Sequence, residues 1–248
     1  MFLIEIDGPD GSGKSSATKK VAEAINGFYT HEPTESEEGK TALILAKSGK
    51  LKESLTYFLR DREQHFKEII IPTLVKGQPV ILDRGNYSTM VYQCVPGESL
   101  VHWRQALPDF IKGLPQVMRA HLTFILTAPI EVLKKRIVER DGKNDVLLNW
   151  GVWERFNSML SWTRWASPSK IVIDTGELSI DEVVQIVLNH MQQYLALTPN
   201  SPVIGWDKVT EHLTLSKRQE FWGFCLSKTG TTPDRIPFKT LETLYREW

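Results

Sequence analysis

The sequence predicts an α/β protein, a five-stranded parallel sheet covered by helices on both faces in three layers. Short apolar runs alternate with longer stretches of helical periodicity, which is the order that parallel strands joined by helices require. A glycine-rich loop separates the first apolar run from the first helical stretch. The chain has 248 residues, 41% of them hydrophobic, so it is long enough to bury the core of such a sheet.

Five apolar runs predict the strands, and the periodic stretches between them predict the helices. Strands are expected over residues 2–6, 28–31, 79–83, 121–127 and 170–174. Helices are expected over residues 15–25, 34–47, 51–76, 130–140 and 178–195. Asn26-Gly27 should end the first helix as a left-handed cap, and Gly77 should stop the third. Pro72 should kink the third helix or break it before its end, whereas Pro129 suits the first turn of the fourth.

The composition changes near the end of the chain. A Thr-Pro-Asn-Ser-Pro stretch is typical of a linker, and it divides a main domain, residues 1–197, from an extension, residues 198–248. The extension is rich in aromatic residues, and Ser216 with Gln219 resembles a capping box that opens a short helix ending at Gly230. Aromatic residues among cations can stack on nucleic-acid bases. Acids nearly balance cations here, so a small, mostly helical apolar cluster docked on the main domain is favoured.

The overall composition predicts a soluble protein of the cytoplasm, or of a host's cytoplasm if the chain is viral. Lys plus Arg number 30 and Asp plus Glu number 30, so no global field draws the chain to nucleic acid or to an anionic membrane. No apolar run approaches the roughly 18 residues of a membrane span, and the N-terminus lacks a signal-peptide pattern. Cys94 and Cys225 stand in apolar surroundings, which predicts reduced thiols rather than a disulfide or a metal site.

The strongest motif is Gly8-Pro9-Asp10-Gly11-Ser12-Gly13-Lys14-Ser15, which has the pattern G-x-x-x-x-G-K-[ST]. It lies between a predicted strand and a predicted helix, the context that a phosphate-binding P-loop needs. Glycines let backbone N–H groups converge on an anion, and the positive end of the helix dipole adds attraction. Lys14 would reach the terminal phosphates of ATP, and the Ser15 hydroxyl would bind Mg²⁺. The residues expected to hold the phosphates are Gly11, Ser12, Gly13, Lys14, Ser15 and Ser16.

A carboxylate and a guanidinium follow the third predicted strand. Asp83 and Arg84 end the apolar run Val80-Ile81-Leu82, and ligands of doubly wound sheets bind at this edge. Asp83 could hold the water of a Mg²⁺ ion, and Arg84 could grip a phosphate with two hydrogen bonds. The alternative is a surface ion pair of little energetic value.

Phe58 and Arg62 are four residues apart in the third predicted helix, so both side chains leave one face. A flat ring and a forked donor together could hold a nucleobase, with the ring stacking and the guanidinium donating to a carbonyl oxygen. A core phenylalanine beside a solvated arginine fits the same residues, and the pattern alone leaves both interpretations open.

Four segments together resemble the thymidylate kinases, P-loop enzymes that phosphorylate dTMP. The P-loop is similar to the family's E-G-x-D-G-x-G-K-[ST], and Glu32-Pro33-Thr34 to its E-P-[GT] turn. Residues 55–65 are similar to L-L-F-x-A-x-R-x-x-H, and residues 83–93 to D-R-Y-x-x-S-x-x-A-Y-Q. The resemblance runs from Phe2 to about Leu195. The extension lies outside it, as in a viral member with an added C-terminal segment.

The resemblance implies a reaction and a role for each matching residue. The substrates would be ATP, with Mg²⁺, and a pyrimidine deoxynucleoside monophosphate, bound by a homodimer without membrane or nucleic acid. It favours the nucleobase interpretation of Phe58 and Arg62. Asp10 would bind the sugar 3′-hydroxyl, Arg84 would bind the acceptor phosphate, and Tyr92 would crowd out a ribose 2′-hydroxyl. Around the base, Phe58 would stack on thymine, Arg62 would donate to its O4, Pro33 would pack nearby, and Ser88 and Thr89 would contact its polar edge.

The chain departs from the family pattern at three places. Gly85 replaces the tyrosine after the Asp-Arg pair, and His31 stands where arginine often precedes Glu-Pro. The expected lid, about residues 136–152, keeps only Asp145 of the family's D-R-x-E. Since the P-loop carries no arginine, a lid cation should stabilise the transferred charge. The candidates are Arg136, Arg140 and Lys143, for which a solvated helix face is the alternative.

These departures motivate two further hypotheses. Gly85 removes bulk and could admit a larger group on the pyrimidine, which suggests a kinase for a 5-substituted deoxyuridylate such as 5-hydroxymethyl-dUMP, or for a broader set of deoxynucleoside monophosphates. A nucleotide-binding regulator or scaffold with weak kinase activity, whose aromatic extension recruits a partner, is the third hypothesis.

Overall fold

The computed structural model describes residues 2–93, 120–142, 153–154, 156–157, 170–197, 214–230 and 238–248. Five parallel strands form one sheet in the order β2-β3-β1-β4-β5, which confirms the predicted class. The strands are β1 (Leu3–Asp7), β2 (Phe28–His31), β3 (Val80–Asp83), β4 (Leu122–Thr127) and β5 (Lys170–Asp174).

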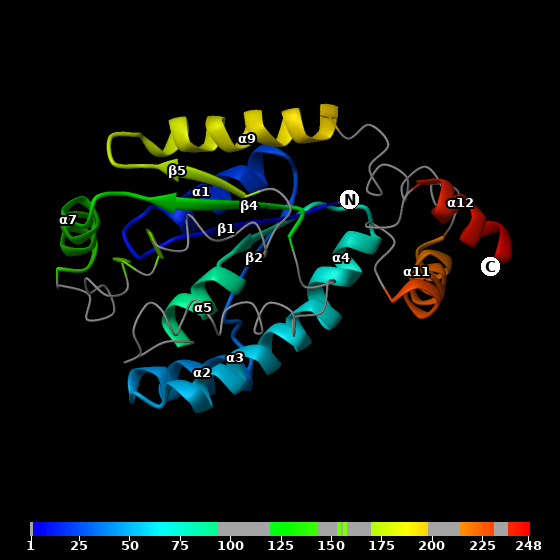
Figure 1. Ribbon diagram of the computed structural model, residues 1–248, viewed down its shortest axis with the longest axis horizontal. Helices are drawn as coiled ribbons and strands as arrows, with labels where there is room; N and C mark the ends of the chain where they lie inside the picture. Colours follow the sequence, from blue (N-terminus) through cyan, green and yellow to red (C-terminus); the bar gives the residue numbers. More distant parts are fainter. Residues whose placement is uncertain are drawn as a thin grey trace.

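Helices cover both faces of this sheet (Figure 1). On one face, α1 (Lys14–Ala24) contacts α9 (Ile180–Leu197). On the other lie α3 (Leu51–His65) and α5 (Asn86–Gln93), which contact each other, with α2 (Glu37–Lys47) packed on α3. The three layers follow from strands that are apolar on both sides: every residue of β1 is buried, because β3 and β4 flank it and helices cover it.

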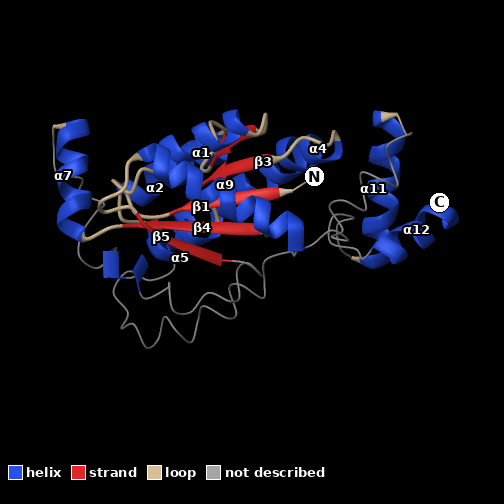
Figure 2. Cartoon of the chain, turned by 90° about the horizontal axis from the view of Figure 1, so that it is seen from above, coloured by secondary structure: helices blue, strands red, loops and turns tan. Residues whose placement is uncertain are grey.

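The two ends of the sheet are closed by different helices (Figure 2). Helix α7 (Ile130–Asp141) follows β4 directly and lies at the end where the strands finish. Helices α11 (Leu215–Thr229) and α12 (Phe238–Glu247) lie at the opposite end, near the N-terminus. The carboxyl ends of the strands are therefore left to the P-loop, α2, α3, α5 and α7.

The third helix is long and is interrupted before its end, next to Pro72, which agrees with one of the two expected outcomes. Helix α3 runs into a π-helical turn, η1 (Phe66–Ile70), and then into α4 (Ile71–Val75). Proline lacks a backbone N–H and its ring crowds the carbonyl four residues earlier, so a wider turn just before it accommodates both. Gly77, with φ of 84°, ends the run as predicted.

Two helices begin later or earlier than the sequence predicts. Helix α2 begins at Glu37 rather than at residue 34, because Ser36 accepts a hydrogen bond from the Gly39 N–H (2.9 Å) and caps it. The predicted capping box at Ser216 is wrong. Thr214 caps α11, and its hydroxyl accepts from the Lys217 N–H at 3.4 Å, so the helix begins two residues before the predicted cap.

The described part of the C-terminal extension packs on the main domain through α11, which contacts α4. Phe221, Trp222 and Cys225 are buried in the same apolar cluster as the strands. The ring of Phe221 lies 5.3 Å from that of Tyr245 and 5.2 Å from that of Trp248, centroid to centroid. Burial raises the pKa of the free Cys225 thiol to about 12, as suits an inert core cysteine.

Several expected features lie outside the described residues: the linker, Cys94, and the part of the lid from residue 143 to 152, including Lys143 and Asp145. Among the described helices, none is long and apolar enough to cross a membrane.

Candidate active site

The P-loop has the backbone that its glycines predict. Gly8, Gly11 and Gly13 have φ of 149°, 83° and 84°. A Cβ on Gly8 would lie 2.2 Å from the Leu126 carbonyl oxygen, and one on Gly11 would lie 2.6 Å from that of Leu133. Only glycine therefore allows this loop to pass so close to β4 and α7.

A cavity opens at the start of α1. Its volume is about 540 Å³. The cavity lies at the N-terminus of α1, where the N–H groups of a helix's first turn and the positive end of its dipole attract an anion. Ser12 does not line it: this residue is buried and faces Gly8. The lining residues are Gly11, Gly13, Lys14, Ser15, Ser16, Arg136 and Arg140.

A second cavity, of about 780 Å³, opens beside the first. All eight residues that the resemblance assigns to the acceptor nucleotide line this cavity. They come from the P-loop, the β2–α2 turn, α3, the end of β3 and α5. The structure also adds Glu32, Gly85, Gln93 and an apolar wall on α2 and α3. The assigned residues are Asp10, Pro33, Phe58, Arg62, Arg84, Ser88, Thr89 and Tyr92, and the wall is Leu43, Ala46, Leu51 and the stem of Lys47.

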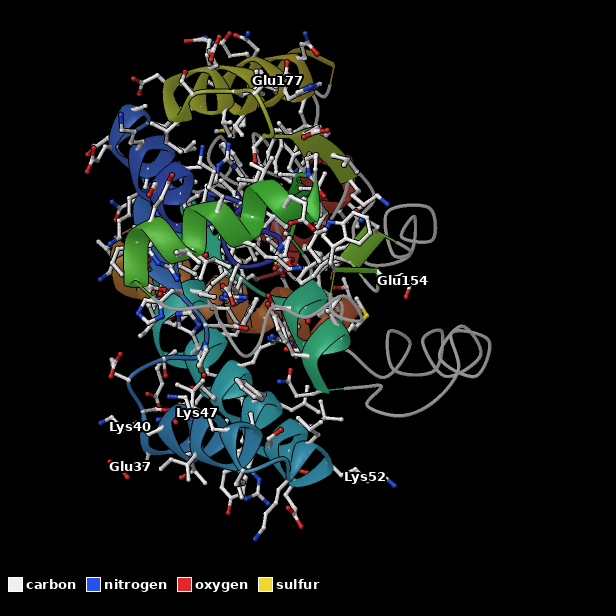
Figure 3. The ribbon with its side chains drawn as sticks, turned by 90° about the vertical axis from the view of Figure 1, so that its left-hand side faces the viewer. Glu37, Lys40, Lys47, Lys52, Glu154 and Glu177 are labelled. Carbon is white, nitrogen blue, oxygen red and sulfur yellow. The ribbon has the colours of Figure 1, made fainter. Side chains whose placement is uncertain are left out.

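Figure 3 views the molecule from the α7 end, with Lys47 labelled on the side of α2 that faces the body of the molecule and Lys52 pointing away from it. Sequence reasoning missed the apolar wall. Leu43 and Ala46 are three residues apart in α2, so their shared face was the available signal. The shared face is obscured in the sequence because Ile44, the apolar residue next to Leu43, does not line the cavity and is 68% exposed.

Asp10 lies between the two cavities and joins their cations. The Lys14 Nζ donates to Asp10 Oδ1 at 3.0 Å, and Arg84 Nη2 donates to the same oxygen. The Tyr92 hydroxyl donates to Asp10 Oδ2 at 3.4 Å. Burial alone would raise the pKa of Asp10, but the charges of Lys14 and Arg84 outweigh it and hold that pKa well below its usual value. The carboxyl is therefore ionised throughout the physiological range.

Arg84 is held in an uncommon backbone conformation. Its φ is 68°, a left-handed value that few residues other than glycine adopt. Its N–H donates to the Ile6 carbonyl (3.0 Å), and its Nη1 donates to the Ser88 Oγ (3.0 Å). Such local strain persists where the surroundings fix it, as at functional sites. Here it directs the guanidinium from the end of β3 toward Asp10.

Arg62 is rigidly held at the inner end of the second cavity. Its Nε donates to Glu32 Oε2 at 2.6 Å, its Nη1 to Asn86 Oδ1 at 2.8 Å and its Nη2 to Thr89 Oγ1 at 2.8 Å. His65 hydrogen-bonds Glu32 Oε1 at 3.4 Å. Burial would raise the pKa of Glu32, but Arg62 and His65 lower it below its ordinary value. Its Nη2 also lies 2.6 Å from Glu32 Oε2. Of the five N–H donors of a guanidinium, the described residues therefore leave one on Nη1 for a ligand.

Asp7, at the end of β1, anchors the N-terminus of helix α5, and the sequence analysis did not single it out. This buried carboxylate accepts from the Gly85 N–H at 3.1 Å, the Ser88 N–H at 2.8 Å and the Ser88 Oγ at 2.6 Å. Negative charge is stabilising at a helix N-terminus. Asp7 thus fixes the first turn of the helix that carries Ser88, Thr89 and Tyr92.

Two residues could supply oxygens to a divalent cation. Ser15 lines the phosphate cavity, and Asp83 ends β3 with its charge close enough to act on Lys14. The Asp83 Oδ1 is buried and has no hydrogen-bond partner among the described residues, so an oxygen is left for a cation's water. Among those residues no cluster of three metal-ligating side chains occurs. This suits Mg²⁺, which binds one or two protein oxygens together with phosphates and water.

The two described lid cations line the phosphate cavity, but both have protein partners. Arg136 Nη2 donates to the Thr175 carbonyl at 2.6 Å and its Nη1 to the Thr175 Oγ1 at 3.0 Å. Arg140 is exposed and forms two bonds to Asp141, at 2.7 and 2.5 Å. Arg136 therefore ties α7 to the loop after β5, whereas Arg140 pairs with Asp141, its exposed neighbour in the sequence.

The fold and the two adjoining cavities define the class: a P-loop kinase with one site for a nucleoside triphosphate and a second for a nucleotide acceptor. Residues 6–187 match the thymidylate kinase family. The chain belongs to the thymidylate kinase family.

Individual relatives agree with this placement. The chain is 32% identical over 166 residues to a thymidylate kinase of Brachyspira hyodysenteriae, covering 64% of this chain and 79% of that protein. It is 30% identical over 199 residues to a probable thymidylate kinase of Methanocaldococcus jannaschii, covering 77% and 96%. The solved thymidylate kinase of Candida albicans shares the fold, with a TM-score of 0.61 and 23% identity over 78% of this chain and 92% of that one.

Proposed function

We propose that this protein transfers the γ-phosphoryl group of ATP to dTMP, giving dTDP and ADP. The observation that carries the proposal is the pairing of two cavities across Asp10, with Lys14 on the donor side and Arg84 on the acceptor side. The attacking atom is a phosphate oxygen that is already ionised, so no strong general base is needed. Catalysis then rests on in-line positioning and on neutralising the charge of the transferred group.

On the donor side, the P-loop amides and Lys14 hold the triphosphate. Ser15 and Asp83 would hold Mg²⁺, which bridges phosphate oxygens and neutralises their charge when bound. When phosphates enter, they compete with Asp10 for Lys14 and Arg84. These two cations are kept close together by one carboxylate, so they are already placed on either side of the group to be transferred.

On the acceptor side, Phe58 would stack on thymine while a free N–H of Arg62 donates to its O4. Glu32, Asn86 and Thr89 hold the guanidinium, so little rotamer freedom is lost when the base binds. Tyr92 would exclude a ribose 2′-hydroxyl. The ring of Phe156 supports it, packed edge-on with centroids 5.8 Å apart.

Arg136 and Arg140 are the proposed lid cations for the charge that develops between the two substrates. Arg140 is exposed and bonds its exposed neighbour Asp141, and a phosphate that enters the cavity can compete with such a surface ion pair at small cost. Arg136 is bound to the backbone of Thr175 and Gly176, and positions the loop beside the P-loop as well as adding charge.

The protein is further proposed to act in the cytoplasm as a homodimer. Ile44 on α2 is 68% exposed, and an exposed apolar side chain of this size favours association when its neighbours are also apolar. Light scattering of the purified chain gives the mass in solution. A monomeric mass for the full chain at working concentration contradicts the dimer.

The function is tested by an acceptor panel of deoxynucleoside monophosphates with Mg-ATP. We expect dTMP to be phosphorylated with a kcat/KM well above those of dCMP, dAMP and dGMP, and Lys14→Ala to abolish turnover. ATP binding without phosphorylation of any monophosphate would instead leave a nucleotide-binding regulator. A preference for a purine acceptor would refute the roles given to Phe58 and Arg62.

A further inference from the structure

An acid stands in the middle of the central strand, where an apolar side chain is expected. Glu5 lies in β1 between β3 and β4 and is only 2% exposed. Its Oε1 has no hydrogen-bond partner among the described residues. Burial raises the pKa of Glu5 to about 8, and the negative charge of Asp7 contributes to this rise. A buried, half-satisfied carboxyl is costly, and nothing in the proposed phosphoryl transfer uses it.

The Glu5 carboxyl occupies the place of a side chain at position 85. A Cβ on Gly85 would lie 2.6 Å from the Glu5 Cδ and 2.6 Å from its unpartnered Oε1. Gly85 itself lines the acceptor cavity. The expectation that Gly85 leaves empty space for a larger base is therefore wrong in its simple form, because the missing side chain is replaced by a carboxyl group. Gly85 therefore lies against both that carboxyl and the cavity.

In the proposed function, this carboxyl would lie near one edge of the base. In the proposed function Arg62 donates to O4 of the pyrimidine, and a substituent on C5 leaves the ring next to that oxygen. Glu5 lies close enough to Arg62 for their charges to interact. The C5 substituent would therefore leave the ring beside Arg62, toward the part of the cavity lining where Gly85 lies against Glu5. The methyl group of thymine has no hydrogen bond to offer there.

We propose that Glu5 and Gly85 form a subsite for a hydrogen-bonding group on the C5 substituent of the acceptor, so that the enzyme also accepts 5-hydroxymethyl-dUMP. The hydroxyl of that substituent bonds the Glu5 Oε1, passing the Gly85 backbone where any other residue would block it. The proposal rests on the proposed function, since the base is oriented by Phe58 and Arg62. It adds a class of acceptor to that function, and it explains why position 5 carries a buried acid and position 85 a glycine.

The test compares dTMP, 5-hydroxymethyl-dUMP and dUMP as acceptors of the full chain with Mg-ATP. We expect 5-hydroxymethyl-dUMP to have a kcat/KM equal to or above that of dTMP, and dUMP to fall below both. The variant Glu5→Leu, of similar size without a hydrogen-bonding group, should lower the ratio of 5-hydroxymethyl-dUMP to dTMP kcat/KM roughly 10-fold, the worth of one hydrogen bond to the substrate. Glu5→Gln, which keeps such a group, should restore most of the ratio. Glu53→Leu, at an exposed position of α3, should leave it unchanged.

The outcomes separate this inference from the proposed function. If dTMP is phosphorylated but 5-hydroxymethyl-dUMP is used 10-fold less well or worse, the subsite is refuted and the kinase stands. If neither is phosphorylated, both proposals fail. Should Glu5→Leu not fold, as judged by thermal unfolding, the comparison of acceptors on the unaltered chain still decides. An unchanged ratio in a folded Glu5→Leu variant would mean that Glu5 serves only the fold, for instance the Tyr87 N–H that it accepts.

Discussion

Arg84 and Lys14 reach Asp10 from different sides, and the carboxylate keeps two like charges together before any phosphate arrives. Both cations are largely buried, and the charge of Arg84 adds to burial in lowering the pKa of Lys14. Two buried cations would repel each other without Asp10. A phosphate that enters takes over its role as their shared anion, so the empty site is already arranged for the charge it has to bind.

Replacing Arg84 should affect turnover more than folding. In Arg84→Ala the acceptor phosphate loses its guanidinium, and removal of one such preorganised charge costs on the order of 10²–10³ in kcat/KM for dTMP. Steady-state kinetics with saturating ATP measure this loss. Arg60→Ala, at an exposed position of α3, is the matched control and should keep normal kinetics. Normal turnover of dTMP by Arg84→Ala would remove this residue from the mechanism.

The buried Glu5 should make stability depend on pH in a defined direction. Its pKa is raised from 4.5 to about 8, so the folded state keeps a proton that the unfolded chain releases above about pH 4.5. Its contribution to the free energy of unfolding is complete below that pH and is lost as the pH rises toward 8. Urea unfolding between about pH 5 and pH 8 should show this fall in the unaltered chain and a smaller one in Glu5→Gln. Parallel curves for the two proteins would show that Glu5 does not carry the proton.

At the scale of elements, α3 holds the turn that leads into α2. Asp61, next to Arg62 and 1% exposed, accepts from the Thr34 N–H at 2.9 Å and from the Ser36 Oγ at 2.6 Å, and also binds the Thr34 hydroxyl. Ser36 in turn caps α2. One carboxylate therefore places both the turn with Pro33 and the apolar wall of the acceptor cavity.

Removing this tether should weaken both stability and acceptor binding. Asp61→Ala leaves three donors without their buried partner, which costs about 2–4 kcal/mol in the free energy of unfolding. The KM for dTMP should rise more than the KM for ATP, because only the acceptor cavity includes α2. Chemical unfolding and kinetics with each substrate measure the two effects. Glu63→Ala, at an exposed position of the same helix, is the control, and equal changes in both KM values would contradict a role confined to the acceptor side.

At the scale of the molecule, the described C-terminal helices belong to the core. Phe221 is fully buried against side chains of the main domain, so Phe221→Ala should lower the free energy of unfolding by about 3–5 kcal/mol. Leu226→Ala, on the same helix but 38% exposed, should cost less than about 1 kcal/mol. Urea unfolding of both variants provides the comparison. Equal, small effects would show that the extension folds apart from the sheet.

Much of the fold could be predicted because it depends on local patterns. All five strands were found within a residue or two, since a buried parallel strand is a short apolar run bounded by turns. The errors lie at helix starts and at α5, a helix that was not among those expected. Thr34 is a residue type that often begins a helix, but its backbone and side chain bind Asp61, 27 residues away. No local sequence pattern predicts that contact. Thr214 replaced Ser216 as a cap for the lesser reason that several hydroxyl residues stand close together there.

The candidate site was predictable where the family motifs reach, and only there. Those motifs name the residues whose side chains face the nucleotides. Three other acids support the site without facing a nucleotide. Asp7 hydrogen-bonds Ser88, Asp61 hydrogen-bonds Thr34, and Glu5 lies against Gly85. Partners of this kind come from other strands and helices, so spacing along the chain does not reveal them.

The order of apolar runs and the glycine loop determined on their own that this chain forms a parallel α/β sheet with a phosphate-binding loop, because periodicity and backbone freedom are properties of neighbouring residues. Only the folded chain decided which charges share Asp10 and that a carboxyl fills the place left by Gly85. Electrostatic energy and packing depend on distance in space, and β1 meets the end of β3 only when the sheet has formed.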